Sequence, residues 1–254
     1  MKVSIIIVSY NAGKFLKPCL KSVFENKAPK EVILVDNASK DDSVDIVKNN
    51  FSKVKIIQND KNVGFASACN QGIEIMKGDY ALLLNTDVIL KGDSLKKMVS
   101  FMNNNRDVGV MGVKLVNEKG ELTYSCKRFQ TFTNVFLRRT FFGAIFKKQI
   151  DDYLMKDYDH KTVKEVDWIS GACMLIRKNA LKNVGFFDPK FFLYVEDMDL
   201  CYRVKKEGVY RVIYNPALRA IHREQRESSK NTRLFLTHLK SFLYFKKKQW
   251  FNQV

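Results

Sequence analysis

The chain has 254 residues, and its 44 Lys and Arg against 27 Asp and Glu give a formal net charge of +17. Apolar residues make up 46% of the chain and it has only 4 prolines, a composition that excludes disorder because enough apolar surface is available to form a core. It has no apolar run long enough to cross a membrane and no signal-peptide pattern, so we expect a protein that neither spans a membrane nor is exported.

Strands and helices are predicted to alternate along the first part of the chain. Pro18 would lie in the first turn of the first predicted helix, where backbone N–H groups have no partner within the helix, so the lack of an N–H costs no hydrogen bond there. This alternation predicts an α/β fold with a Rossmann-like, mostly parallel, doubly wound central sheet flanked by helices. The runs rich in Val and Ile predict strands at 2–9, 31–35, 54–57 and 80–84, with helices at 17–26, 39–49 and 66–76 between them.

Polar residues follow these strands at their carboxyl ends, which is where ligands gather in such sheets. Asp36 directly follows the second strand, and there it can accept hydrogen bonds from a base or a ribose; its plain alternative is a helix cap. Asn85 and Asp87 follow the fourth strand, where they suit a hard cation that also holds phosphate oxygens, although such residues also form ordinary turns. Gly64 fits either a turn or a close approach of the backbone to a nucleotide.

The chain has neither G-x-x-x-x-G-K-[ST] nor G-x-G-x-x-G, so a nucleotide would be bound without either of these loops. The five cysteines are odd in number and none form C-x-x-C, which favours buried, reduced thiols in a cytosolic protein over disulfides or a zinc site.

The second half of the chain supplies further chemical groups. After Trp168, the small residues Ser170 and Gly171 would let a ligand approach the backbone. An aromatic run then leads into Glu-Asp-Met-Asp at 196–199, where closely packed carboxyls raise one another's pKa and suit one of them to accept a proton. The alternative is that these acids only begin a helix that ends near residue 207. A strand at 209–214 then leads to His222.

The positive charge belongs to the second half, which holds 26 basic and 13 acidic residues. Residues 127–150 contain six basic residues and no acid, and residues 222–254 contain eight basic residues against two acids; aromatic side chains are interleaved in both stretches. Such stretches fit an anionic membrane surface or a nucleic acid. The alternative is a solvated basic face over a packed aromatic core.

Taken in order, these segments closely resemble family 2 glycosyltransferases, and most of all the rhamnosyltransferase-like members that build bacterial surface polysaccharides. The resemblance covers about residues 3–225. The motifs that carry it are V-S-I-I-I-V-S-Y-N (3–11), V-D-N-A-S-K-D-D-S (35–43), N-V-G-F-A-S-A-C-N (62–70), L-L-L-N-T-D (82–87), W-I-S-G-A (168–172) and F-L-Y-V-E-D-M-D-L-C-Y-R (192–203).

The resemblance implies a GT-A fold and the inverting transfer of a hexosyl or deoxyhexosyl group. The donor would be a UDP- or dTDP-sugar, the acceptor a hydroxyl of a glycan or lipid-linked saccharide, and the cofactor Mn²⁺ or Mg²⁺. It also implies a catalytic domain at 1–222, with a nucleotide-binding half at 1–112 and an acceptor and catalytic half at 113–222, followed by a helical tail at 223–254.

By the same resemblance, each motif residue has an expected role. Tyr10 and Asp36 would contact the base and ribose of the donor. Asp87 matches the metal-binding acid of the family's D-x-D, and His222 is similar in position to a histidine that completes the metal shell in some relatives. Asp197 matches the catalytic base. The remaining expected site residues are Ser9, Gly64 and Asn85 near the donor, Glu196 beside the base, and Trp168, Ser170, Gly171 and Asp199 in the donor and acceptor pocket.

Two other classes of protein are alternatives to this enzyme. A nucleic-acid-binding protein would explain the charge of +17, but it leaves the Glu-Asp-Met-Asp cluster without a role. A non-catalytic nucleotide-sugar binder would lack the base or the metal acid, and both Asp197 and Asp87 are present. We therefore predict a glycosyltransferase with no specific nucleic-acid partner.

The tail is predicted to form an amphipathic helix in which Leu236, Leu239 and Leu243 make an apolar stripe edged by Lys240 and residues 246–248. Such a helix would hold the enzyme at the anionic inner face of the cell membrane, as a cytoplasmic peripheral protein. The alternative is that the stripe packs on the catalytic domain or on a second copy of the chain in a homo-oligomer.

Overall fold

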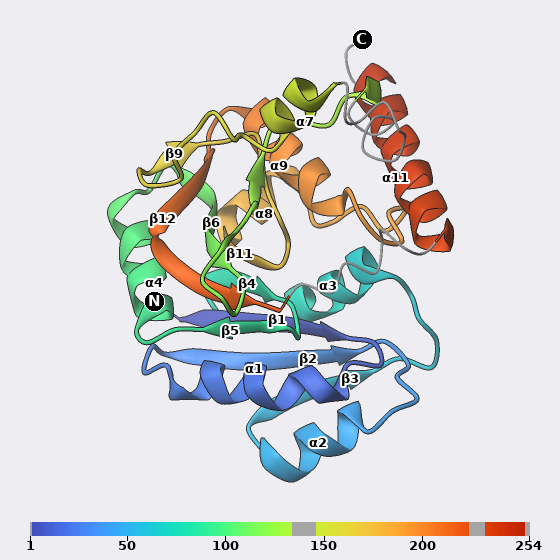
Figure 1. Ribbon diagram of the computed structural model, residues 1–254. Helices are drawn as coiled ribbons and strands as arrows, with labels where there is room; N and C mark the ends of the chain where they lie inside the picture. The colour runs from blue at the N-terminus through green and yellow to red at the C-terminus, as the bar shows by residue number, and fades with distance from the viewer. Residues whose placement is uncertain (1, 134–145, 224–231, 252–254) are drawn as a thin grey trace.

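The computed structural model of the protein describes residues 2–133, 146–223 and 232–251 (Figure 1). Its helices are α1 (Gly13–Glu25), α2 (Ser43–Asn50), α3 (Phe65–Glu74), α4 (Ser94–Asn104), α7 (Lys147–Tyr153), α8 (Lys178–Val184), α9 (Glu196–Glu207) and α11 (Thr232–Phe251). Its strands are β1 (Val3–Ser9), β2 (Lys30–Asp36), β3 (Val54–Gln58), β4 (Tyr80–Leu84), β5 (Val88–Leu90), β6 (Val108–Val116), β7 (Leu122–Thr123), β8 (Cys126–Lys127), β9 (Lys164–Glu165), β10 (Trp168–Ile169), β11 (Cys173–Arg177) and β12 (Arg211–His222).

One large sheet organises the described chain, with its main strands in the order β3-β2-β1-β4-β11-β6-β12-β5. β1 to β4 pair in parallel, as the sequence predicts, and β12 pairs in parallel with β6. β11 lies antiparallel between β4 and β6, so the sheet is mixed. The predicted α/β fold class is therefore confirmed.

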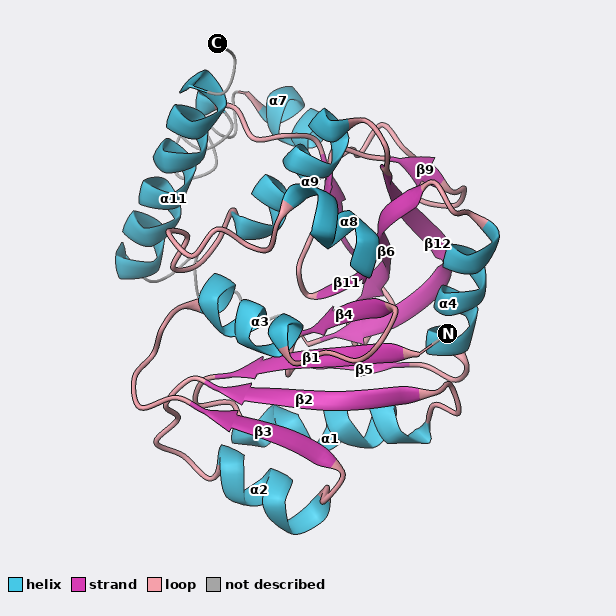
Figure 2. Cartoon of the chain, turned by 180° about the vertical axis from the view of Figure 1, so that it is seen from behind, coloured by secondary structure: helices cyan, strands magenta, loops and turns pink. Residues whose placement is uncertain are grey.

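The sheet has a core on each face. Successive side chains of a strand point to opposite faces, so Ile5 and Ile7 join the apolar cluster that includes α1 and α4, while Ile6 joins the cluster that includes α3 and α9. Figure 2 shows α1 and α3 on opposite sides of β1. Because both faces are covered, these strands are continuously apolar rather than alternating.

The first helix differs from its prediction. It begins at Gly13 rather than at residue 17, so Pro18 lies inside it instead of in its first turn. The early start depends on a distant loop, because the Gly13 N–H donates to the Asp41 carboxylate (2.9 Å) and the Ala12 N–H donates to Ser43 Oγ (3.2 Å). The i−4 partner lost at Pro18 would be the carbonyl of Lys14, an exposed residue.

β12 is a single long strand, although Pro216 lies within it. Its pairing with β6 shifts register between Asn215 and Arg219, and proline is tolerated at such an irregularity because it has no N–H to donate. Beyond the shift, β12 pairs with β5, and His222 lies opposite Val88. The end of β12 is thereby brought to the segment that follows β4.

α11 packs on the same core as α3 and α9. Phe242 and Phe245 are fully buried in that cluster, and Leu239 packs against it. Leu236 and Leu243 are 49% and 48% exposed. The predicted single stripe of three leucines is therefore wrong, because Leu239 lies on the packed side of the helix. Residues 134–145 of the first basic stretch and 224–231 of the tail lie outside the described residues.

All five cysteines are buried and free, which agrees with the prediction of buried thiols. Among the described residues, the search for a helix both long and apolar enough to cross a bilayer finds none.

Candidate active site

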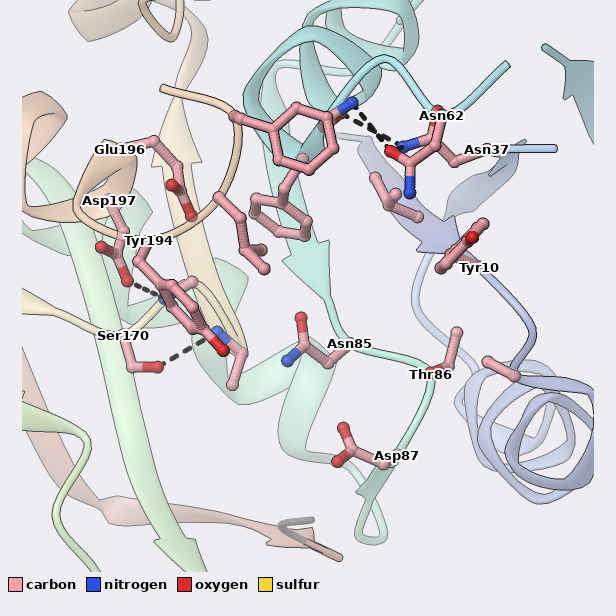
Figure 3. Close-up of a pocket in the computed structure, with 18 of the residues that line it drawn as sticks. Tyr10, Asn37, Asn62, Asn85, Thr86, Asp87, Ser170, Tyr194, Glu196 and Asp197 are labelled. Atoms are coloured by element: carbon pink, nitrogen blue, oxygen red, sulfur yellow. Dashed lines mark hydrogen bonds between the residues drawn. The ribbon is translucent and has the colours of Figure 1, made fainter. Parts of the chain in front are cut away.

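A pocket of about 640 Å³ opens at the carboxyl ends of β1 and β4 (Figure 3). Both halves of the chain line it. The first half contributes Tyr10, Asn37, Asn62, Gly64, Asn85, Thr86 and Asp87, and the second half contributes Ser170, Gly171, Phe192, Leu193, Tyr194, Glu196 and Asp197. Of these, Asn37, Asn62, Thr86 and the aromatic loop 192–194 had no role assigned from the sequence. In the sequence, these residues are distinguished only by their position inside or next to the family motifs.

Asp197 lies in the first turn of α9 and is fixed by backbone donors. The Gly171 N–H donates to its Oδ2 (2.9 Å) and the Met198 N–H donates to its Oδ1 (2.8 Å). Burial raises the pKa of Asp197 above its ordinary value, while these N–H bonds and the charge of Lys127 oppose the rise. Each oxygen keeps a further lone pair, so the carboxylate is oriented and still able to accept a proton.

Glu196 lies beside Asp197 in a more enclosed position. It is 5% exposed, and its Oε2 is a buried acceptor with no protein partner. Burial, together with the neighbouring Asp197 charge, raises the pKa of Glu196 well above its ordinary value of 4.5. The two adjacent acids therefore have different properties, with Glu196 holding its proton more tightly.

The turn that presents these acids is strained. Tyr194 and Val195 have φ values of 69° and 74°, in the left-handed region that non-glycine residues seldom adopt. The cost is greatest for the β-branched Val195, which caps the start of α9. The turn places Tyr194 in the lining of the pocket, as it does Glu196 and Asp197 (Figure 3).

Asp87 and His222 lie together at the end of β12. His222 Nε2 lies 3.3 Å from Asp87 Oδ1, and the Arg223 N–H donates to the Asp87 carbonyl (3.0 Å). The described residues contain no group of three or more His, Cys, Asp or Glu side chains that could hold a metal ion. The Asp87 carboxylate still fits Mn²⁺ or Mg²⁺, because these ions prefer oxygen ligands and complete their coordination with substrate phosphates and water. The His222 imidazole suits Mn²⁺ better than Mg²⁺.

Asparagines organise the end of the pocket near β1 and β2. Asn37 Nδ2 donates to Asn62 Oδ1 (2.9 Å), and the Val63 N–H donates to Asn37 Oδ1 (3.0 Å). Asp36 behind them is 3% exposed; its Oδ2 accepts from the Ser39 N–H (3.1 Å), and its Oδ1 is buried with no protein partner.

Ser9 Oγ is also buried and without a partner, whereas Tyr10 at the rim is 53% exposed.

Gly64 makes a close approach to the aromatic loop. It has φ +87°, and a Cβ added there would lie 2.6 Å from the carbonyl oxygen of Phe192. The next residue, Phe65, donates its N–H to that same oxygen (2.7 Å). The two sides of the pocket are joined at this contact, and glycine is required for it.

Two expected pocket residues lie elsewhere. Trp168 is 6% exposed, donates its Nε1–H to the carbonyl of Arg128 (2.8 Å) and is absent from the pocket lining. Asp199 is 1% exposed and pairs with Arg203 (2.8 Å) and Lys248 (2.9 Å). The expectation that they line the pocket is not met, because residues 168 and 199 point into the packing behind it.

Comparison with known proteins agrees with this geometry. Residues 4–185 match the family described as glycosyl transferase family 2. The chain belongs to this family. The glycosyltransferase is 30% identical to the rhamnosyltransferase WbbL of Escherichia coli K12 over 260 residues, which cover 97% of this chain and 94% of that protein.

It is also 23% identical to an N-acetylglucosaminyl-diphospho-decaprenol L-rhamnosyltransferase of Mycobacterium tuberculosis, over 95% of this chain and 82% of that protein. Among solved structures, the mannosyltransferase PcManGT of Pyrobaculum calidifontis, in complex with GDP-Man and Mn²⁺, matches with a TM-score of 0.64 at 17% identity. That match covers 89% of this chain and 58% of PcManGT. The expected GT-A fold and the rhamnosyltransferase-like resemblance are confirmed.

The contact at Gly64 predicts the effect of adding one methyl group. Gly64→Ala should lower the free energy of unfolding by more than Gly120→Ala does, as measured by urea denaturation. Gly120 has a similar φ of +82° with no atom within 4 Å of an added Cβ, so its substitution costs only the backbone strain, about 1–2 kcal/mol. Equal losses in the two variants would show that the chain tolerates a side chain between residues 64 and 192.

The raised pKa of Glu196 predicts a pH-dependent change in stability. The native state binds this proton more tightly than the unfolded chain, so the carboxyl's favourable contribution is present below about pH 4.5 and is lost as the pH rises toward the folded pKa. Glu196→Gln has no titrating carboxyl at this position, so it does not lose stability as the pH rises. The stability of the variant relative to wild type should therefore increase with pH, measured by urea denaturation across this range. A difference that stays constant with pH would contradict the raised pKa.

Proposed function

We propose that this glycosyltransferase is metal-dependent and inverting. It transfers a hexosyl or deoxyhexosyl group from a nucleotide-diphosphate sugar to a hydroxyl of a lipid-linked saccharide or growing glycan. The names of the two rhamnosyltransferase relatives support a deoxyhexose and, for one of them, a diphospho-decaprenol acceptor. The complex of PcManGT with GDP-Man and Mn²⁺ supports a nucleotide-sugar donor and a divalent cation.

One observation supports the proposal: Asp87, proposed to bind the cation with His222, and Asp197, the proposed base, both line one pocket. In Figure 3, Asp197 and Asp87 face the pocket from opposite sides, with Asn85 between them. Inversion by a single displacement needs an acceptor hydroxyl activated on one side of the sugar and a leaving group stabilised on the other. It needs no covalent nucleophile.

Asp197 is the residue that takes the proton from the acceptor hydroxyl. Its two backbone hydrogen bonds fix the carboxylate and favour its ionised form. Glu196 is less suited to this role, because its pKa is raised further and its side chain is more enclosed. In its protonated form Glu196 can instead donate a hydrogen bond into the pocket.

The donor lies across the first half of the pocket in this proposal. The exposed ring of Tyr10 can stack on the base, and the unpartnered oxygen of Asp36 can accept from the base or ribose. Asp87 and His222 would hold Mn²⁺ or Mg²⁺, and the bound cation would neutralise charge on the departing diphosphate. Asn85, between the two acids, can donate to a phosphate or sugar oxygen.

The site of action follows from the acceptor and from the charge. A lipid-linked acceptor is confined to a membrane, and the excess of basic residues in the second half favours the anionic inner leaflet. We therefore place the enzyme in the cytoplasm, peripherally bound to the inner face of the cell membrane.

Asp197→Asn tests the catalytic assignment. Turnover should fall by about 10² to 10⁴, because a general base is lost, while the dissociation constant for the donor changes little. Slow hydrolysis of a panel of nucleotide sugars with Mn²⁺ measures turnover without knowledge of the acceptor, and calorimetric titration measures donor binding. The exposed Asp60→Asn is the matched control and should behave as wild type. An Asp197→Asn enzyme that keeps more than about a tenth of the wild-type rate would remove Asp197 from this role.

Metal removal tests the other side of the site. EDTA should abolish hydrolysis and added Mn²⁺ or Mg²⁺ should restore it. Asp87→Ala should weaken both donor binding and turnover, and His222→Ala should do so to a smaller extent, because a neutral ligand contributes less charge than a carboxylate. The exposed Asp93→Ala serves as the control. Full activity in chelator would refute the metal dependence, and an unaffected His222→Ala enzyme would leave His222 a structural residue only.

A further inference from the structure

α11 has a second, outward face that is apolar. Leu236, Leu243 and Trp250 are 49%, 48% and 77% exposed, and the spacing of seven residues places them in one line along the helix. Phe251, beside Trp250, is 66% exposed. Such large apolar side chains, gathered in one line rather than scattered, indicate a docking surface. In Figure 1 this helix lies at the edge of the molecule.

The same face is basic. Lys240 and Lys247 are exposed and each follows a leucine of the line by four residues, which places them on the same side of the helix. α11 contains no acidic residue. Lysine is depleted in the cores of protein interfaces, and leucines add nothing to phosphate contacts with a nucleic acid. At a lipid surface, by contrast, lysine stems lie along apolar groups while their charges reach anionic headgroups.

The inward face of α11 is attached to the loop and helix that form the pocket. Ser241 Oγ donates to the carbonyl of Leu193 (2.9 Å), and the ring of His238 packs edge-on against Tyr194, with centroids 5.5 Å apart. Lys248 Nζ lies 2.9 Å from carboxylate oxygens of both Asp188 and Asp199. A surface that binds the outward face would therefore lie one helix away from the pocket.

We propose that the outward face of α11, formed by Leu236, Lys240, Leu243, Lys247 and Trp250, docks on an anionic lipid bilayer with the helix lying in the interface. The inward contacts then keep the pocket next to the membrane that carries the acceptor, and this last point rests on the proposed function. Docking itself requires only the exposed apolar and basic side chains.

Vesicle cosedimentation of the full chain tests the proposal. Vesicles of phosphatidylcholine with about 30% phosphatidylglycerol should bind the protein, raised salt should weaken binding, and phosphatidylcholine alone should bind at least about tenfold less. Leu243→Glu with Trp250→Glu should reduce binding by at least about tenfold, because charge replaces the inserted apolar groups. Val209→Glu is the matched control, since Val209 is 57% exposed and lies outside α11.

A second pair of variants tests the lysines of the outward face. Lys240→Gln with Lys247→Gln should weaken binding by about tenfold, whereas Lys96→Gln with Lys97→Gln on α4 removes the same charge and should change it little. If the two pairs of substitutions weaken binding equally, net charge alone explains the attraction to the vesicles, and the proposal is overturned. The proposal would also be overturned if the Leu243→Glu, Trp250→Glu variant bound vesicles as well as wild type. The same holds if the wild-type chain is a dimer and this variant is a monomer that still binds vesicles, because the face would then be a contact between two copies of the chain.

Donor hydrolysis without lipid separates this inference from the proposed function. Variants on the outward face should hydrolyse the donor at the wild-type rate, which also shows that they are folded. If the wild-type protein hydrolyses the donor but does not bind vesicles, the docking surface is overturned and the proposed function is not. A wild-type protein that binds anionic vesicles and hydrolyses no nucleotide sugar supports the docking surface and counts against the proposed function.

Discussion

The burial of β4 is the constraint on which the rest of the structure depends. All five of its residues are buried, and it is paired on both edges, in parallel with β1 and antiparallel with β11. A polar group within such a strand needs a buried partner, as the Tyr80 hydroxyl has in Asn103 Oδ1 (2.8 Å), and the remaining four side chains of β4 are apolar. Asn85 and Asp87 follow at the end of the strand, and Ser170 and Gly171 reach the same point because they come just before β11. The pocket lies where the most enclosed strand ends.

Several features of the pocket cost stability. Buried oxygens of Ser9, Asp36 and Glu196 have no protein partner, and Tyr194 and Val195 adopt left-handed backbone conformations. An unsatisfied buried polar group costs about 1–3 kcal/mol, and backbone strain of this kind costs about as much. Among these, Glu196 and Tyr194 line the pocket, while Val195, Ser9 and Asp36 adjoin lining residues in the sequence. The surrounding sheet, with a core on each face, supplies the stability that tolerates them.

The tail helix joins this site to the surface. Its inward face belongs to the core through Phe242 and Phe245, and it reaches the buried Asp199 through Lys248. A buried carboxylate needs such partners, because removing it from water is expensive unless its charge is compensated. Asp199 thus lies in the packing, only two residues after Asp197, which lines the pocket. The same helix presents leucines, lysines and a tryptophan outward, so it has one packed face and one exposed face.

The sequence by itself determined the strands β1 to β4, the helices between them and the polar residues at their ends, because local apolar runs and turn residues report directly on buried strands. The ordered motifs also identified the family and predicted roles for Asp87, Glu196 and Asp197, which all line the pocket. Only the tertiary structure decided that His222 meets Asp87, that Gly171 holds Asp197, and that Asp199 faces Lys248 rather than the pocket. These contacts join distant segments, and strand register and helix rotation set them. A one-residue shift in either would turn the side chain to another face without changing the local pattern from which the sequence was interpreted.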